Sequence, residues 1–197
     1  MTDRRLVLAD ILDLRAYERE RDEFRAGVIA LKKRRRVAVG PHITLLFENR
    51  DTIRFQIQEM ARAERILTDE GIETELRMYN PLIPLPGTLS ATLFIELTTD
   101  EQLREWLPKL VGIERAMVLA LSDGSEVRCT PEAGHATQLT REEITASVHY
   151  IGWSLTPEQV SAFVAGSVDL VVDHPEYPER VTLSDETHAE LVADLEA

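Results

Sequence analysis

The polar residues best suited to chemistry lie where one predicted element ends and the next begins. Glu48, Asn49 and Arg50 follow an apolar run that predicts a short strand, and they precede a helical pattern. The N-terminus of a helix presents free backbone N–H groups, so polar side chains placed there could help to hold an anion. The simpler alternative is that Asn49 only caps the helix and that Arg50 is only a surface cation.

Glu64 is the most unusual residue of the helix that follows, which the pattern predicts over residues 52–70. At 100° per residue Glu64 falls in the middle of an apolar face, where an unpaired carboxylate is costly. It therefore either forms a structural ion pair or hydrogen bond, with Arg50, Tyr79 or His149 as candidate partners, or contacts a ligand, a metal ion or a transferable proton. A third alternative is a frayed helix end that leaves Glu64 exposed. The face consists of Ile53, Ile57, Met60 and Leu67.

Three further polar residues of this helix complete the candidate set. Gln56 lies at the edge of the apolar face, and Glu59 and Arg62 lie beside a second, smaller apolar seam. Glu59 and Arg62 are three residues apart, which is also the spacing of a simple surface ion pair. The predicted ligand-binding site is Glu48, Asn49, Arg50, Gln56, Glu59, Arg62 and Glu64.

Motifs of familiar catalytic and metal sites are missing from the sequence. It has no Cys-x-x-Cys, His-Glu-x-x-His, Walker loop or Gly-x-Ser-x-Gly. Glu132 and His135 have the Glu-x-x-His spacing of di-iron helices, but Pro131 precedes them and Gly134 stands between them in a predicted loop. The one cysteine, Cys129, is expected to be a small core residue and cannot form an internal disulfide. The sequence assigns no catalytic residue, metal or cofactor and favours a non-catalytic role.

Charge is divided unevenly along the 197 residues. Residues 1–65 contain 15 Lys and Arg against 11 Asp and Glu, whereas residues 66–197 contain 7 against 24. The basic run 32–36 either packs against the acidic remainder or forms, with Arg54, Gln58 and Arg65, an exposed surface for an anionic partner. The acidic bulk and the absence of interleaved aromatic residues disfavour nucleic acid. Because no apolar run approaches a membrane span and the N-terminus lacks a signal-peptide core, a cytoplasmic location is expected.

Helices and strands do not alternate strictly, so the pattern predicts an α+β fold. We expect N-terminal helices and a short β-hairpin to pack on a mostly antiparallel sheet with additional helices. The chain is expected to form one domain, within which a basic helical lobe (1–80) and an acidic mixed lobe (88–197) would be joined by the Pro-rich segment 81–87. Helices are expected over 14–33, 52–70, 73–79 and 99–110 and from Pro157 and Ser184; strands are expected over 37–39, 43–47, 91–97, 117–121, 126–129, 146–155, 168–173 and 180–183.

The sequence also resembles a known family. The specific part runs from Phe47-Glu48-Asn49-Arg50 through Gln56-Ile57-Gln58-Glu59-Met60 to Arg62-Ala63-Glu64-Arg65-Ile66. The stretches 31–37, 39–41, 79–84, 89–96 and 173–177 add to the likeness. Together they resemble an uncharacterised bacterial family, of similar length, that is classed as a domain of unknown function.

The resemblance implies a biological setting but no catalytic residues. Members of that family are often encoded beside a rubrerythrin-like di-iron protein and an iron–sulfur oxidoreductase, which implies a part in peroxide or redox defence. This chain lacks the cysteines of an iron–sulfur cluster and the paired Glu-x-x-His of a di-iron bundle. The leading hypothesis is therefore a non-catalytic partner or adaptor of such a redox protein. The alternative is a small-molecule- or metal-binding protein, or an enzyme, with its site around Glu64.

Overall fold

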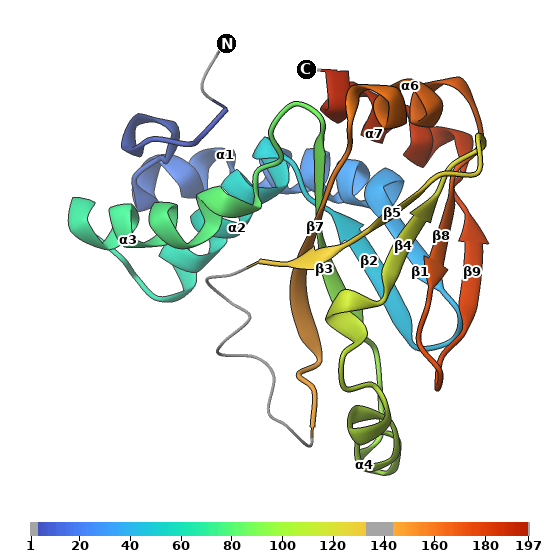
Figure 1. Ribbon diagram of the computed structural model, residues 1–197. Coiled ribbons are helices and arrows are strands. Elements are labelled where there is room, and N and C mark those ends of the chain that lie inside the picture. The colour runs from blue at the N-terminus through green and yellow to red at the C-terminus, as the bar shows by residue number, and fades with distance from the viewer. Residues whose placement is uncertain (1–3, 133–143, 197) are drawn as a thin grey trace.

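The computed structural model describes residues 4–132 and 144–196 (Figure 1), and the predicted loop around Glu132 and His135 falls largely outside them. Local sequence signals account for the first elements. Helix α1 (Leu14–Arg35) begins where predicted, because Asp13 caps it: its carboxylate accepts the backbone N–H of Ala16. The basic residues at the end of α1 lie where the negative end of the helix dipole favours them. The chain then forms a hairpin from strands β1 (Arg36–Val39) and β2 (Ile43–Phe47).

Two antiparallel sheets form the centre of the molecule, which confirms the predicted α+β class. The five-stranded sheet has the order β1-β2-β3-β7-β6, and the four-stranded sheet has the order β5-β4-β8-β9. The larger sheet contains strands from both sides of the Pro-rich segment 81–87. The further strands are β3 (Thr88–Ile95), β4 (Met117–Ala120), β5 (Glu126–Arg128), β6 (Thr130–Pro131), β7 (Val148–Ser154), β8 (Asp169–Val172) and β9 (Glu179–Thr182).

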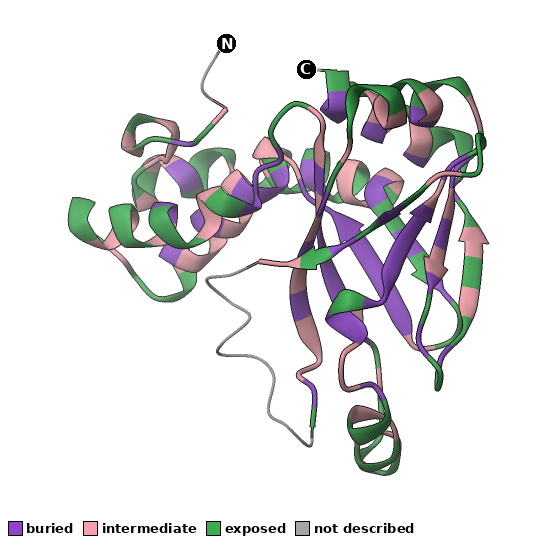
Figure 2. Ribbon diagram, in the orientation of Figure 1, coloured by how far each residue is buried: buried purple, intermediate pink, exposed green. Residues whose placement is uncertain are grey.

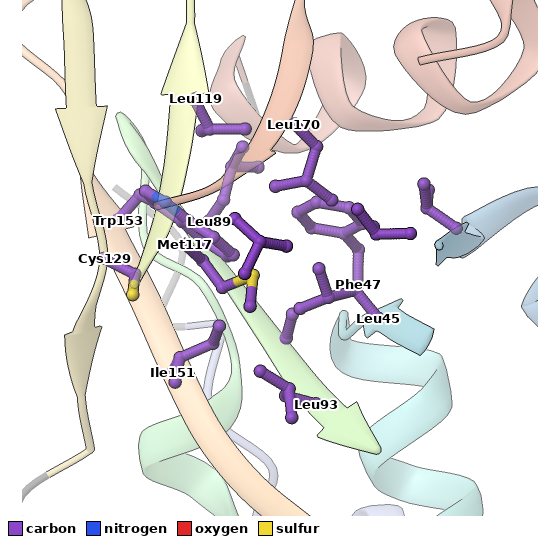
Figure 3. Close-up of a cluster of buried hydrophobic side chains, with 14 of the residues drawn as sticks. Leu45, Phe47, Leu89, Leu93, Met117, Leu119, Cys129, Ile151, Trp153 and Leu170 are labelled. Carbon is purple, nitrogen blue, oxygen red and sulfur yellow. The ribbon is translucent and has the colours of Figure 1, made fainter. Parts of the chain in front are cut away.

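The main hydrophobic core lies between the two sheets. Alternate residues of β2 and β7 point into it, and Figure 3 shows Phe47 and Trp153 among side chains contributed by both sheets. The rings of Phe47 and Trp153 lie 5.6 Å apart between centroids, and both residues are almost fully buried. Figure 2 shows that much of the central strands of both sheets consists of buried residues. Cys129 belongs to this core, as the sequence predicted.

Helices cover the opposite face of the larger sheet. Helices α1, α2 (Arg50–Ala63) and α3 (Asp69–Tyr79) lie together on one side of the molecule (Figure 1). A second, smaller apolar cluster forms there from α2, α3, the segment that follows α3 and the N-terminal segment. Its buried members are Leu6, Ile53, Ile57, Leu76, Leu82 and Ile83. The other helical elements are α4 (Asp100–Lys109), α6 (Pro157–Ala165), α7 (Asp185–Glu196) and the short 3₁₀ turns Leu8–Asp10, Asn80–Leu82 and Ile113–Arg115.

Helix α2 ends earlier than the sequence predicted. It stops at Ala63 instead of continuing to residue 70, because Arg65 adopts a left-handed conformation with φ of 55°. The N–H of Ile66 then donates to the carbonyl of Ala61, and the N–H of Arg65 donates to the carbonyl of Arg62. This is the Schellman arrangement, which normally uses glycine and is therefore hard to recognise when arginine takes its place.

Gly71, which directly follows the predicted end of that helix, lies inside the next helix. Thr68 caps α3, and its hydroxyl accepts the N–H of Gly71. Leu67, which was expected on the buried face of α2, is 79% exposed because it lies in the connection between the two helices. The end of α2 at Ala63 thus directs the following residues away from the buried face of that helix.

The basic run 32–36 packs against acidic residues of the same chain. Arg35 is 1% exposed and forms ion pairs with Asp194 and Glu190 of α7. Arg34 pairs with Glu190 at 2.6 Å, and Arg36 pairs with Glu96 at 3.6 Å. Two other members of the expected basic surface have internal contacts as well: Arg54 donates to a backbone carbonyl, and Gln58 is buried. Of the two interpretations of the charge division, the structure supports internal packing.

Within the described residues, no helix combines the length and the apolar character needed to cross a membrane.

Candidate functional site

A small cavity with a mixed polar and apolar lining opens between α2 and the helix-covered face of the larger sheet. Its volume is about 120 Å³. Strands β2, β3 and β7 form its floor, and residues from α1, α2, α3 and the 3₁₀ turn Asn80–Leu82 form its walls. The lining residues are Lys32, Leu46, Glu48, Thr52, Ile53, Gln56, Tyr79, Leu82, Thr92, Phe94, Val148 and Tyr150.

Strand register brings the floor of this cavity together from distant parts of the sequence. Leu46 of β2 lies opposite Thr92 of β3, and Thr92 lies opposite Tyr150 of β7. Side chains at directly opposed positions share one face of a sheet, so these three form a row across the floor. Phe94 and Val148, another opposed pair, form the next row.

Glu48 is the central polar group of the site. It lies just after β2 and is 6% exposed. One carboxylate oxygen accepts the hydroxyl of Thr92 at 2.6 Å, and the other accepts the hydroxyl of Thr52 at 2.5 Å. Two donors leave part of the acceptor capacity of a carboxylate unused.

No lysine, arginine or histidine in the described parts of the chain forms an ion pair with the Glu48 carboxylate. Arg35 approaches Glu48 but donates to its backbone carbonyl, at 3.1 Å. A buried carboxylate without a counter-cation is costly for a protein. The site therefore contains a negative group whose natural complement is a cation or a strong hydrogen-bond donor.

The other polar walls add donors and aromatic surface. Burial, together with smaller effects of the neighbouring Tyr79 and Glu48, raises the pKa of Tyr150 to about 12. Tyr150 is therefore a neutral phenol at physiological pH and can donate its hydroxyl hydrogen. Gln56 contributes an amide from the first half of α2. Lys32 lies at the cavity with its ammonium 5.2 Å from the ring centroid of Phe55.

Two of the seven predicted site residues, Glu48 and Gln56, line this cavity, whereas Asn49 and Arg50 do not. Asn49 caps α2, and its side-chain oxygen accepts the N–H groups of Asp51 and Thr52. Arg50 forms an ion pair with Asp10 at 2.7 Å. The first free N–H groups of α2 are thus satisfied within the chain, as expected for a simple helix cap.

The expected surface pair between Glu59 and Arg62 is absent, because both residues instead contact α1. Arg21 donates two hydrogen bonds of 2.8 Å to the carboxylate of Glu59, and Tyr17 donates another of 2.7 Å. The Arg21 guanidinium lowers the pKa of Glu59 to about 2, against the opposing effect of burial. Arg62 pairs with Glu18 at 2.5 Å. These contacts connect α1 to α2 and lie outside the lining of the cavity.

The expectation that Glu64 is buried on an apolar face is wrong. Glu64 is exposed and forms the C-cap of α2, because the helix turns away at Arg65. None of the expected partners is paired with it: Arg50 bonds to Asp10, Tyr79 lines the cavity beside Glu48, and His149 bonds to Thr145. The frayed-end alternative describes this position best, and the carboxylate in apolar surroundings is Glu48.

Sequence reasoning missed four functional candidates, namely Thr52, Tyr79, Thr92 and Tyr150. Period-two alternation along the predicted strands could have placed Thr92 and Tyr150 on one sheet face, but pairing between strands is needed to bring them together. No group of three or more metal-binding side chains is found in the residues that the structure describes.

Comparisons with known proteins identify the family of this chain. The profile of the family described as "Protein of unknown function (DUF3501)" matches residues 5–195. A crystal structure of a novel protein of unknown function from Burkholderia pseudomallei K96243 is 37% identical, with a TM-score of 0.89 over 97% of this chain and 99% of that chain. No curated protein gives a significant match. The chain therefore belongs to the DUF3501 family of proteins of unknown function.

Proposed function

We propose that this protein binds a small ligand carrying a positively charged nitrogen in the cavity lined by Glu48. The observation that carries the proposal is the Glu48 carboxylate, which is 6% exposed, is held by two threonine hydroxyls and forms no ion pair within the described chain. A bound ammonium or guanidinium group would supply the missing counter-charge and use the free acceptor positions.

The size and walls of the cavity restrict the ligand further. A volume of about 120 Å³ holds roughly four water molecules, at about 30 Å³ each. It therefore admits one small functional group or the head of a longer molecule. Tyr79, Phe94 and Tyr150 supply aromatic surface, which attracts cations in addition to the carboxylate.

Lys32 gives the site a second, opposite charge. Its side chain lies at the cavity, so an anionic group on the same ligand would find a partner there. A small zwitterion, with its ammonium at Glu48 and its anion toward Lys32, fits both charges. A simple amine fits Glu48 alone.

Titrations followed by two-dimensional NMR of the backbone amides test the proposal. The probes are methylammonium, guanidinium and glycine, with acetate and methanol as controls of similar size. We expect the three cationic or zwitterionic probes to shift resonances of Glu48, Thr92 and Tyr150, and the two controls to leave them unchanged.

Glu48→Gln should weaken binding at least tenfold, because it removes the charge while retaining the shape of the side chain. Glu64→Gln is the matched control, since it makes the same chemical change at an exposed position, and it should leave binding unchanged. Equal binding by wild type and Glu48→Gln, with the variant folded by circular dichroism, would contradict the proposal.

The adaptor role in a redox system ranks below this proposal. It retains the resemblance as its support, with a rubrerythrin-like or iron–sulfur redox protein as the implied partner. The exposed basic surface that it needed is largely occupied, because Arg34 and Arg35 pair with α7 and Arg36 pairs with Glu96. A site for a metal ion around Glu64 has an equally weak basis, because that carboxylate stands exposed at the end of α2.

A further inference from the structure

A second and larger concavity lies between the N-terminal segment and the chain around the end of α3. Its volume is about 690 Å³, and it shares no lining residue with the Glu48 cavity. One wall is formed by residues 4–8, and the other by α3 from Glu73 onward and the segment 80–85. We call this concavity the arginine groove; its lining residues are Arg4, Arg5, Val7, Leu8, Glu73, Leu76, Arg77, Asn80, Pro81, Ile83 and Leu85.

Specific contacts hold the two walls of the arginine groove in place. The Asn80 side chain accepts the backbone N–H of Leu6 at 2.8 Å and donates to the backbone carbonyl of Leu6 at 2.9 Å, so it binds both backbone polar groups of that residue. The Leu6 side chain is 2% exposed in the apolar cluster below. Arg4 donates to the backbone carbonyls of Pro84 and Asp194, at 3.2 Å each. The groove is therefore preformed.

The interior of the groove is mainly apolar and partly uncovered. Leu76 and Ile83 form a buried base, whereas Val7 and Leu85 are 56% and 52% exposed. Covering solvent-exposed aliphatic side chains with an apolar group removes them from water and so lowers the free energy. Two such residues on facing walls favour a ligand with an apolar body.

Positive charge predominates around this apolar interior. The groove is lined by three arginines and one acidic residue, Glu73, in a chain whose net charge is −13. Arg4 is partly committed to Asp194, with 3.9 Å between the guanidinium and the carboxylate. Arg77 is exposed on α3 and donates to the hydroxyl of Thr74 at 2.9 Å. Guanidinium groups bind carboxylates and phosphates through paired hydrogen bonds.

We propose that the arginine groove binds an amphiphilic anion, namely a carboxylate or phosphate attached to an alkyl or aryl body. The apolar body would cover Val7 and Leu85, and the anionic head would meet the exposed Arg77. A volume of about 690 Å³ lies within the range of about 300–1,000 Å³ that is typical of small-molecule sites. This size favours a small amphiphile over a segment of another protein. The proposal does not depend on the Glu48 cavity, because the two sites differ in charge and lining.

The test is an NMR titration of the full chain with three probes that share one alkyl body. Octanoate carries a negative head, octylammonium a positive head and octanol a neutral head. We expect octanoate to give saturable shifts of the methyl groups of Val7, Leu76 and Leu85, with an affinity at least tenfold higher than that of the other two probes. Equal affinity for all three probes, or shifts that lie elsewhere, would overturn the proposal.

Charge-reversing variants identify the arginine responsible. Arg77→Glu should weaken octanoate binding at least tenfold and strengthen octylammonium binding. Arg25→Glu makes the same change at an exposed position of α1 outside the groove lining, and it should alter both affinities less than twofold. Because Arg77 is exposed, its variant should retain the wild-type unfolding midpoint. If octanoate does not bind, the small-anion proposal is wrong.

Discussion

Replacing Glu59 by glutamine tests whether this carboxylate connects α1 to α2 or is available to a ligand. Arg21 donates two hydrogen bonds to Glu59, and Tyr17 donates a third. The Arg21 guanidinium is the largest influence on the pKa of Glu59, which falls from 4.5 to about 2 although burial acts in the opposite direction. The folded state therefore favours the ionised carboxylate.

The pKa difference sets the expected size of the effect. One pKa unit corresponds to about 1.4 kcal/mol, so a fall from 4.5 to about 2 corresponds to about 3 kcal/mol. The side chains of Arg21 and Glu59 are 22% and 26% exposed, and solvent screening reduces this value to about 2–3 kcal/mol. Because the folded pKa lies below the unfolded one, this stabilisation is complete above pH 4.5 and is lost as the pH falls toward 2.

Urea unfolding followed by far-UV circular dichroism, at a series of pH values from 7 to 3, measures the difference directly. Glu59→Gln should unfold with about 2–3 kcal/mol less free energy than wild type at pH 7. The difference should shrink steadily below pH 4.5, because wild type then loses a contribution that the variant lacks. Glu18→Gln is the control: its partner contact is at the surface, so it should cost less than about 1 kcal/mol. A constant difference across the pH series, or none at pH 7, would refute the reasoning.

Three further predictions concern single residues. Arg35→Met should destabilise the fold by about 3–5 kcal/mol in urea unfolding, because the buried carboxylate of Asp194 then keeps only the longer contact with Arg4. Adding Asp194→Leu should recover most of the loss, and no recovery would contradict this. Arg65→Gly should raise the free energy of unfolding by about 1 kcal/mol, because glycine adopts the left-handed conformation without steric cost; a lower value would show that the arginine side chain matters more. Burial raises the pKa of Cys129 to about 11, so a thiol-specific disulfide reagent at pH 8 should modify it only after unfolding, and rapid modification of the native protein would contradict its place in the core.

Much of the secondary structure could be predicted because its signals are local. Asp13 before α1 and Pro157 at the start of α6 act on the backbone within one turn, and both elements begin where expected. The two strands expected over 117–121 and 126–129 pair as β4 and β5, and the Asp123-Gly124 step between them suits a hairpin turn, in which Gly124 has φ of 87°. In each case the residue type alone decides the conformation.

Residues of the candidate site were harder to predict, because helical periodicity is informative only while the helix continues. Glu64 fell on the buried face only if α2 continued past Ala63, and the left-handed Arg65 ends it there. Arginine is unfavourable in that conformation, so the presence of an arginine at position 65 did not predict the end of the helix. Two residues of the segment 48–56, Glu48 and Gln56, line the cavity, and the buried carboxylate is Glu48 and not Glu64.

The sequence by itself determined the α+β class, most of the elements and the presence of polar residues at the junction of β2 and α2, because propensity, capping and alternation act between near neighbours. Only the tertiary structure decided which of these groups meet. The Glu48 carboxylate accepts a hydrogen bond from Thr92, which lies 44 residues away in the sequence, and Arg35 forms an ion pair with Asp194 at a separation of 159 residues. Strand register and helix docking set such contacts, and these depend on how the whole chain buries its apolar surface.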